Sequence, residues 1–545
     1  MAIVSEPRSR RVGRGYTLYS TRRRRGPYIA AGLLVVLVLV VAGGAIAVVS
    51  SGASLSADST ALARVGMPLG GGTIESVSVL GGATSHRIPV EVRNNEVWPR
   101  GTIPAGERVK IEAVVKRPGW ISWLAGSRDR VYLTLVAPVA APTHTYLTLA
   151  KNQPLKVSFD HPVQTVFYGP TASQLKRRLL PTASTELTLP HSGSAGTVWV
   201  AGTPRTWETA PPTAVSWFPA GAATAAVATP APGTRITPTT PLTLTFSKSV
   251  SAALGNSRPP VSPGGSGTWQ QVGDHTLVFH PTGFGYGLGA TVHIGLPSGV
   301  RLVGSSGGAG SWSVAPGSTK RLQELLATLG YLPVTFNGAT TVAQTPGAEE
   351  QAAINPPAGT FAWRWANIPG ALRSIWQPGT SGEMTKGAVM AFENDQGMTA
   401  DGVPGPQVWK ALITASIQGQ RSTFGYTFVH VNQGSPETET TWHNGRTVVS
   451  GLVNTGIPAA PTANGLFAVF EHAPSVTMSG TNPDGSHYSD PGVPYDSYFN
   501  GGDALHGFIR GGYGYPQSLG CVEMPYSEAS AVYPYTPVGT LVNVT

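Results

Sequence analysis

The residues with the clearest chemical potential are one cysteine and one histidine near the C-terminus. Cys521 is the only cysteine among the 545 residues, and Gly520 directly precedes it. His506, followed by Gly507, lies 15 positions earlier. A histidine within reach can remove the proton of a thiol, and a glycine beside the cysteine lets the backbone approach a substrate closely. This pattern predicts a cysteine nucleophile, Cys521, with His506 as its base.

The N-terminal sequence predicts the compartment in which this chemistry would take place. Residues 28–49 form an uncharged run of 22 residues, long enough to cross a bilayer as one helix. Eight arginines and one acid, Glu6, precede the run, so the positive-inside rule keeps the N-terminus in the cytoplasm and the rest outside. A cleaved signal peptide is the alternative, and the length of the run favours an uncleaved single-pass anchor in the cell membrane. Outside the cytoplasm, an unpaired cysteine is either buried, linked to another chain or reactive.

The charge balance excludes one class of partner. The chain carries 37 basic and 28 acidic residues, a net charge of +9, but eight of the arginines and one acid lie in the N-terminal tail. The remaining 29 basic and 27 acidic residues differ by only +2. Because the exported part is nearly neutral and shows no basic stripe interleaved with aromatic residues, we expect no nucleic-acid partner.

Composition and periodicity predict a multidomain, mainly β protein. Glycine and proline together number 115, and charged residues make up only 12%, which suits short strands joined by turns. Partly alternating apolar residues at 109–115 and 131–136 predict strands within a β-rich stalk over residues 60–220, built as one or two modules. Residues 221–234 are rich in Ala, Thr and Pro and are predicted to form a linker.

A β-sandwich-like module is predicted over residues 236–304. Three runs with period-two patterning lie at the spacings of a small sandwich: residues 242–246, 275–279 and 291–294. This segment resembles the immunoglobulin-like modules that precede catalytic domains in actinobacterial wall enzymes. Since no acid or thiol joins the three histidines here, we expect strand-face residues rather than a metal site at His275, His280 and His293.

Residues 316–416 predict a small three-helix domain. Four leucines between residues 322 and 329 recur at i, i+3, i+4 and i+7, so they share one helical face that ends at Gly330. Further helices are predicted from Thr385 and from Pro406, a residue suited to the first position of a helix. Together with the Asp-Gly-Val-Pro-Gly loop at 401–405, this pattern resembles the peptidoglycan-binding domain type 1 family. The resemblance implies a wall-binding domain for glycan strands or stem peptides.

An insertion at about residues 334–382 interrupts this resemblance. It contains three tryptophans, Trp363, Trp365 and Trp376. Two interpretations are open for their rings, which either stack on sugar faces or pack within the inserted segment.

The last 125 residues predict a β-rich C-terminal domain, with strands near 426–431, 465–470 and 539–544. The strings at 504–507 (ALHG) and 518–524 (SLGCVEM) resemble those of the YkuD-type L,D-transpeptidase family, and the resemblance extends over residues 422–545. It implies that a cysteine thiolate attacks the peptide carbonyl before a terminal D-alanine. D-Alanine leaves, and an amine of a neighbouring stem peptide resolves the thioester.

The resemblance also implies roles for individual residues. Cys521 is the nucleophile and His506 the general base, and the Gly507 carbonyl orients the imidazole. The backbone amides around Gly520 and Cys521 form the oxyanion hole. Neither a cofactor nor a metal is implied. Three further residues in this region are candidate substrate contacts: Tyr495, Tyr513 and Ser518.

The sequence as a whole predicts a membrane-anchored cell-wall enzyme that cross-links peptidoglycan through Cys521. Its expected partners are peptidoglycan stem peptides and glycan strands, the cytoplasmic membrane around the N-terminal helix, and carbapenem-type β-lactams that acylate the thiol. Leu519 and Glu523 depart from the family pattern at positions that bear on substrate binding. Two alternatives are open: an L,D-carboxypeptidase that resolves the thioester with water, and a non-catalytic peptidoglycan-binding scaffold.

Overall fold

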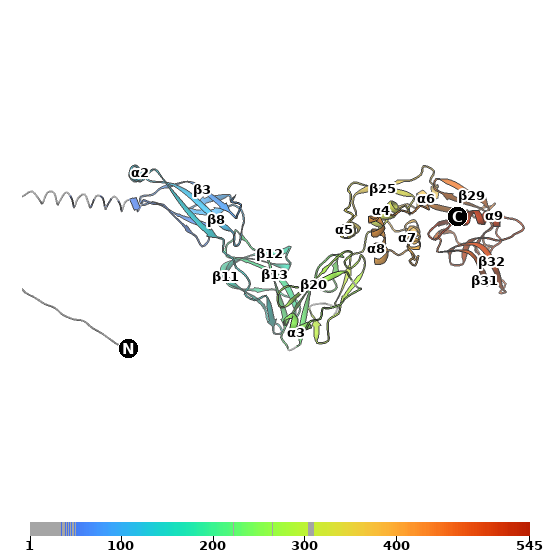
Figure 1. The fold of residues 1–545 in the computed structure, drawn as a ribbon, viewed down its shortest axis with the longest axis horizontal. Coiled ribbons are helices and arrows are strands. Elements are labelled where there is room, and N and C mark those ends of the chain that lie inside the picture. The colour runs from blue at the N-terminus through green and yellow to red at the C-terminus, as the bar shows by residue number, and fades with distance from the viewer. Residues whose placement is uncertain are drawn as a thin grey trace, which may run out of the picture. The chain divides into compact units, whose positions relative to one another are not determined.

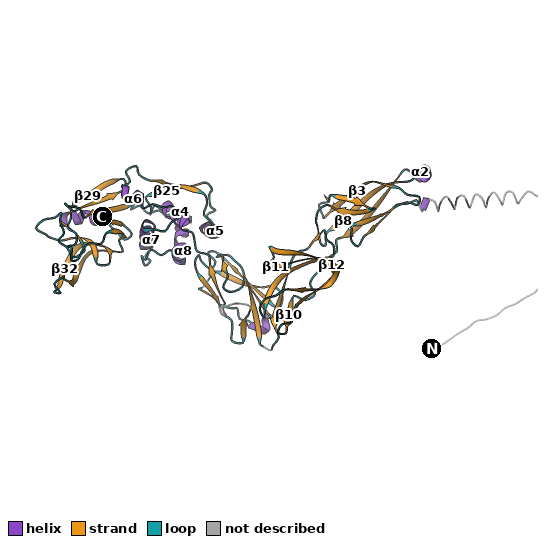
Figure 2. Cartoon of the chain, turned by 180° about the vertical axis from the view of Figure 1, so that it is seen from behind, coloured by secondary structure: helices purple, strands orange, loops and turns teal. Residues whose placement is uncertain are grey.

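The computed structural model describes residues 51–221, 223–263, 265–303 and 310–545, and before them Leu34, Leu39, Val41, Gly43, Ala45, Val48 and Val49. Strands predominate and most of the helices lie between residues 319 and 417, which confirms a mainly β fold with a few helices (Figures 1 and 2). The predicted membrane segment, residues 28–49, lies mostly outside the described residues and stays a prediction. Within the part of the chain that is described, no helix is both long and apolar enough to span a bilayer.

The chain forms two compact units, and the first contains residues 1–145, 156–188 and 198–215. One of its sheets has the order β1 (Ser54–Ala57), β2 (Ala63–Gly66), β6 (Glu96–Pro99) and β5 (Val90–Arg93). A second sheet has the order β4 (His86–Arg87), β3 (Thr73–Gly81), β8 (Arg108–Lys116) and β9 (Arg128–Val136). β8 and β9 confirm the strands predicted at 109–115 and 131–136. More and less buried residues alternate along both strands because neighbouring side chains of a strand point to opposite faces.

Further strands and one short helix complete the first unit. β11 (Leu155–Thr171) runs antiparallel to β13 (Gly196–Thr203), and β12 (Gln174–Leu189) borders β11. β7 (Ile103–Pro104) pairs with β14 (Glu208–Thr209), and α2 spans Gly119–Ala125.

The second unit contains residues 146–155, 189–197 and 216–545, and it begins with a β-sandwich. β10 (Tyr146–Leu149) pairs in parallel with the end of β15 (Thr213–Pro219). The first sandwich sheet has the order β20 (Gly267–Gln271), β21 (Thr276–Pro281), β18 (Leu242–Phe246), β16 (Thr224–Thr229) and β23 (Val300–Leu302). The other has the order β17 (Arg235–Ile236), β24 (Ser311–Val314), β22 (Thr291–Ile294) and β19 (Val261–Ser262). A short helix, α3, spans Val250–Leu254.

The linker predicted at 221–234 is wrong, because residues 224–229 form β16 inside the sandwich sheet. Ala226 and Ala228 pack into the sandwich core, while Ala225 and Val227 pack into a second cluster with Phe218. Small apolar side chains are therefore buried on both faces of this strand. A strand of this kind lacks the alternation that would separate it from an Ala-rich linker.

The helical domain contains α4 (Thr319–Leu329), α7 (Glu383–Asp395) and α8 (Pro406–Ile417). The four leucines of α4 are all at most 3% exposed, which confirms the predicted apolar face. Ser318 Oγ accepts a hydrogen bond from the Arg321 amide at 3.2 Å and caps the start of α4. Gly330 ends the helix with a φ of 93°, as a left-handed cap requires.

The insertion is a folded part of this domain. It contributes β25 (Val334–Gly338), α5 (Pro346–Ile354), β26 (Gly359–Trp363) and α6 (Gly370–Ser374), with β25 and β26 paired as an antiparallel ribbon. Trp363, Trp365 and Trp376 all pack against the hydrophobic core of the helical domain, with Trp376 edge-on to Phe361. The structure thus favours packing over sugar stacking for the three rings.

Two sheets build the C-terminal domain. The first has the order β29 (Arg446–Leu452), β28 (Thr438–His443), β27 (Thr427–Asn432), β35 (Leu541–Val544) and β30 (Gly465–Ala468). The second has the order β31 (Glu471–Thr481), β32 (His487–Asn500), β33 (Asp503–Gly507) and β34 (Val522–Met524). α9 (Tyr526–Val532) and a 3₁₀ turn at Tyr533–Tyr535 follow β34.

The helical and C-terminal domains share one hydrophobic core. Alternate residues of β27 face two different cores: Phe428 packs with the helices, whereas Val429 packs between the two sheets. Trp442 of β28 belongs to the helical core, and its indole N–H donates to the Asn367 carbonyl of the insertion at 2.8 Å. The first sheet is therefore buried on one side by helices and on the other by the second sheet.

We predict that the two domains unfold together. Phe392 of α7 is 1% exposed in the shared core, so Phe392→Ala should cost about 3–5 kcal/mol and lower the urea midpoint of both domains. The rate at which a thiol reagent modifies Cys521, the only cysteine, reports unfolding of the C-terminal domain as urea is raised. Leu244→Ala, in the separate sandwich core, serves as the control and should leave the Cys521 transition unchanged. An unchanged transition in Phe392→Ala would show that the domains unfold independently.

Candidate active site

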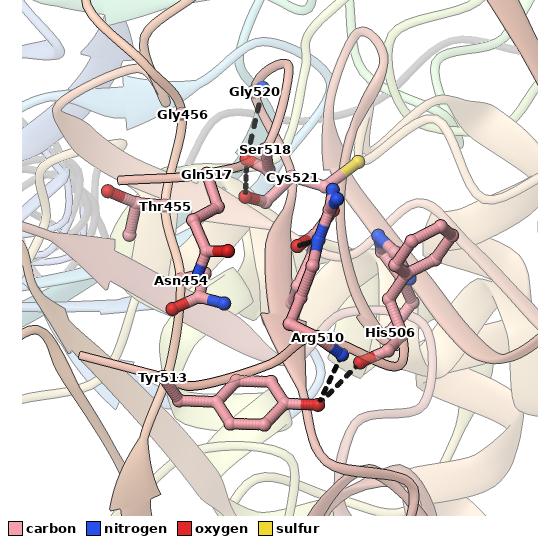
Figure 3. A network of polar contacts seen from close by, with 12 residues as sticks. Asn454, Thr455, Gly456, His506, Arg510, Tyr513, Gln517, Ser518, Gly520 and Cys521 are labelled. Carbon is pink, nitrogen blue, oxygen red and sulfur yellow. Dashed lines mark hydrogen bonds and ion pairs between the residues drawn. The ribbon is translucent and has the colours of Figure 1, made fainter. Parts of the chain in front are cut away.

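Two short parallel strands bring the predicted histidine and cysteine together. His506 lies in β33, and Cys521 directly precedes β34, which pairs with β33 so that His506 faces Glu523. Alternate residues of these strands, Leu505 and Val522, point into the core between the sheets. The residues between them point to the other side. Figure 3 shows the imidazole and the thiol on this side of the strands.

The imidazole of His506 is buried and oriented by the backbone. The residue is 2% exposed, and its Nδ1 lies 3.1 Å from the Gly507 carbonyl oxygen. A carbonyl can only accept, so Nδ1 carries the proton and Nε2 is left as the basic nitrogen. Burial lowers the pKa of His506, which keeps the ring neutral and able to take a proton at neutral pH.

The thiol of Cys521 is held in its protonated form. Cys521 Sγ donates to the Gly502 carbonyl at 3.5 Å, and burial raises the pKa of the thiol to about 12. The Ala504 backbone amide opposes this shift, and the negative charge of Asp503 adds to it. A resting thiol with such a pKa needs a base to become nucleophilic, and His506 on the adjacent strand can supply one.

The turn before the cysteine depends on a glycine. Gly520 has a φ of 123°, and a Cβ at this position would lie 2.5 Å from Asp503 Oδ1. The hydroxyl of Ser518 ties the turn together, donating to the Cys521 carbonyl at 2.5 Å and accepting from the Gly520 amide at 3.2 Å. The Gly520 amide already has a partner, so an oxyanion hole that used it would have to displace Ser518 Oγ.

The three candidate substrate contacts all have partners within the protein, and their contact with a substrate stays a prediction. Ser518 is only 1% exposed and braces the turn. The Tyr513 hydroxyl donates to the Phe508 carbonyl at 2.6 Å and accepts from the Arg510 amide at 3.2 Å, so it closes the loop after β33. Tyr495 has a φ of 67°, and its ring packs against Tyr533 and the core between the sheets.

Several polar residues of this region escaped the sequence analysis. Arg510 and Glu523 form an ion pair with two hydrogen bonds. The only sign of this pair in the sequence was Glu523, which departs from the family pattern. Burial raises the pKa of Tyr488, on β32, and the nearby Cys521 thiolate charge raises it further. Asp496 is fully buried, and burial raises the pKa of its carboxyl to about 7. No local motif marks these residues, because they meet only through the pairing of β32, β33 and β34.

Comparison with known families agrees with this geometry. The family model of the YkuD L,D-transpeptidase catalytic domain matches residues 426–544. The chain carries a YkuD domain. The model of a peptidoglycan binding domain matches residues 373–412, so both resemblances seen in the sequence are confirmed. A search among curated proteins found no match.

Solved structures of L,D-transpeptidases are also similar to the chain. The catalytic domain of the E. faecium enzyme is 25% identical and covers 23% of this chain and 100% of its own length, with a TM-score of 0.21. An L,D-transpeptidase from Mycobacterium smegmatis is 13% identical, and the match covers 58% of this chain and 96% of the other, with a TM-score of 0.20. L,D-transpeptidase 3 from Mycobacterium tuberculosis, in complex with a faropenem-derived adduct, is 12% identical. This match covers 58% of this chain and 96% of the other, with a TM-score of 0.21.

We predict a steep pH dependence for alkylation of the resting YkuD domain. Because the pKa of Cys521 lies near 12, its rate with iodoacetamide should rise about tenfold per pH unit from pH 7 to 9. Asp503→Asn removes a negative charge that raises this pKa, so the variant should react about two- to tenfold faster at pH 8. Asp274→Asn, in an exposed turn of the sandwich, is the matched control and should react as the wild type does. A rate that is already level by pH 8 would contradict the protonated resting thiol.

Proposed function

We propose that the chain is a cell-wall L,D-transpeptidase that uses Cys521 as its nucleophile and His506 as its general base. One observation carries the proposal: within the YkuD match, Cys521 directly precedes β34 and the buried His506 lies on the adjacent strand β33, with its imidazole oriented by the Gly507 carbonyl. Acyl transfer through a thiol needs these groups and neither a metal nor a nucleotide.

The first half of the reaction acylates the enzyme. As the thiol proton moves to His506 Nε2, the sulfur attacks the carbonyl carbon before the terminal D-alanine, and the carbonyl oxygen becomes an oxyanion. When this intermediate collapses, the carbon–nitrogen bond breaks. His506 gives its proton to the leaving amine, D-alanine departs, and a thioester to Cys521 remains.

The second half transfers the acyl group to another stem peptide. The acceptor amine attacks the thioester carbonyl and loses a proton to His506, and the carbon–sulfur bond then breaks to return the thiol. The bond energy of the first peptide is kept in the thioester, so the reaction needs no ATP. A carbapenem-type β-lactam would acylate the same thiol by opening its ring, and its adduct would have no leaving amine.

The other domains support this function by location. The match to a peptidoglycan binding domain suits attachment to glycan strands or stem peptides, and the proposed membrane helix at 28–49 would place the YkuD domain outside the cytoplasm. Two attachments raise the effective concentration of the enzyme at the wall, so that each can be weak.

We predict that cross-linking depends on both the Cys521 thiol and the His506 imidazole. Incubated with a disaccharide-tetrapeptide, the wild type should release D-alanine and form a dimeric product joined through the third residues. Cys521→Ala should lower this rate by about four orders of magnitude or more, and His506→Gln by about 10²–10⁴, because the thiol must lose its proton in the rate-determining acylation.

Chromatography of the products distinguishes the alternatives. Tripeptide product without dimer would indicate an L,D-carboxypeptidase, in which water resolves the thioester. A folded wild type that leaves the tetrapeptide intact would favour a non-catalytic scaffold. Circular dichroism of each variant controls for folding.

A further inference from the structure

Beside the proposed catalytic pair, an arginine is fixed by a buried carboxylate. Arg510 Nε and Nη2 each donate to one carboxylate oxygen of Glu523 at 2.7 Å. The Glu523 side chain is 5% exposed and that of Arg510 is 31% exposed. Glu523 stands opposite His506 in the strand pairing, so the ion pair lies on the face that also carries the imidazole.

The guanidinium is held on further sides by the loop that follows β33. Its carbon lies 4.6 Å from the centre of the Phe508 ring, and the Phe508 ring meets the His506 ring edge-on at 6.0 Å. Tyr513 fixes the loop by bonding the backbone of Phe508 and Arg510. The position of the guanidinium is thus coupled through Phe508 to that of the proposed base.

Part of the guanidinium is left for a ligand. Of its five N–H groups, Glu523 uses two, and no described residue accepts a hydrogen bond from the other three. An arginine with a free edge and a fixed plane is suited to a planar anion such as a carboxylate.

The place of the leaving group in the proposed reaction indicates which carboxylate Arg510 would bind. His506 delivers its proton to the leaving amine, so the leaving residue lies on the His506 side of the thiol. Arg510 lies on the same side, because the Phe508 ring contacts both the His506 ring and the Arg510 guanidinium. Building on the proposed function, we propose that Arg510 binds the terminal carboxylate of the leaving D-amino acid, and that Glu523 is the positioning residue that orients it.

This assignment gives Glu523 a role at a position where the chain departs from the family pattern. The positive charge comes from the loop after β33 and is held in place by the acid after the cysteine. The ligand carboxylate stays intact throughout: it is bound before acylation and leaves with the free amino acid when the carbon–nitrogen bond breaks. The selectivity that follows is for donors that end in a free carboxylate.

The test compares two tetrapeptide donors, one with a free terminal carboxylate and one with a terminal amide. The wild type should acylate about 10–100-fold faster per unit concentration with the free acid, the factor expected for a charge-assisted pair. Arg510→Gln should lose this preference, because it should slow the acid donor about 10–100-fold more than it slows the amide donor. Arg446→Gln, on an exposed residue of β29, is the matched control and should keep the wild-type ratio.

Glu523→Gln separates orientation from folding. It removes the negative charge and one of the two acceptors of Arg510 but leaves the cation, so the acid-to-amide ratio should fall part of the way, mainly through a higher KM for the acid donor. An unchanged ratio in Arg510→Gln, with normal thermal unfolding, would overturn the inference while leaving the proposed function standing. A wild type that acylates with neither donor would overturn both.

Discussion

The parallel pairing of β33 with β34 is the constraint on which the rest of the site depends. These two short strands carry the imidazole, the residue after the thiol and the acid that holds Arg510. Leu505, Val522 and Met524 anchor the strands in the core between the two sheets. A one-residue slip in this pairing would turn the polar residues into the core and the apolar ones out, so the buried side fixes the register of the reactive side.

Burial determines the protonation state of both reacting groups. A thiol with a pKa of about 12 is ionised in about one molecule in 10⁵ at pH 7, and the nearby carboxyl groups of Asp503 and Glu523 contribute to this value. The imidazole is kept neutral by the same burial. The resting pair is thus thiol and imidazole rather than an ion pair. In the proposed reaction, the thiol gives up its hydrogen bond to the Gly502 carbonyl and passes its proton to His506 as the sulfur attacks the substrate carbonyl.

Residues with local signals were predicted well from the sequence, and residues defined by tertiary contacts were not. The leucines of α4 and the alternation of β8 follow from spacing along the chain, and the structure confirms both. The His-Gly and Gly-Cys pairs are also visible in the sequence, and their catalytic roles stay a prediction that rests on family resemblance. β16 was mistaken for a linker because its small side chains are buried on both faces. Ser518 was predicted only as a candidate substrate contact, and no signal in the sequence indicated that its hydroxyl bonds the turn around Gly520. The Arg510 and Glu523 pair joins residues 13 apart across a folded loop, and no periodic pattern encodes such a contact.

The central claim is that Cys521 forms a covalent bond with the donor peptide, and intact mass spectrometry tests it most directly. The protein is mixed with a tetrapeptide donor in the absence of an acceptor amine and quenched in acid within seconds. The account predicts a mass increase equal to the donor minus D-alanine, mapped to the peptide that contains Cys521 and absent from Cys521→Ala. Release of D-alanine by a folded Cys521→Ala variant, or an adduct on another residue, would contradict it.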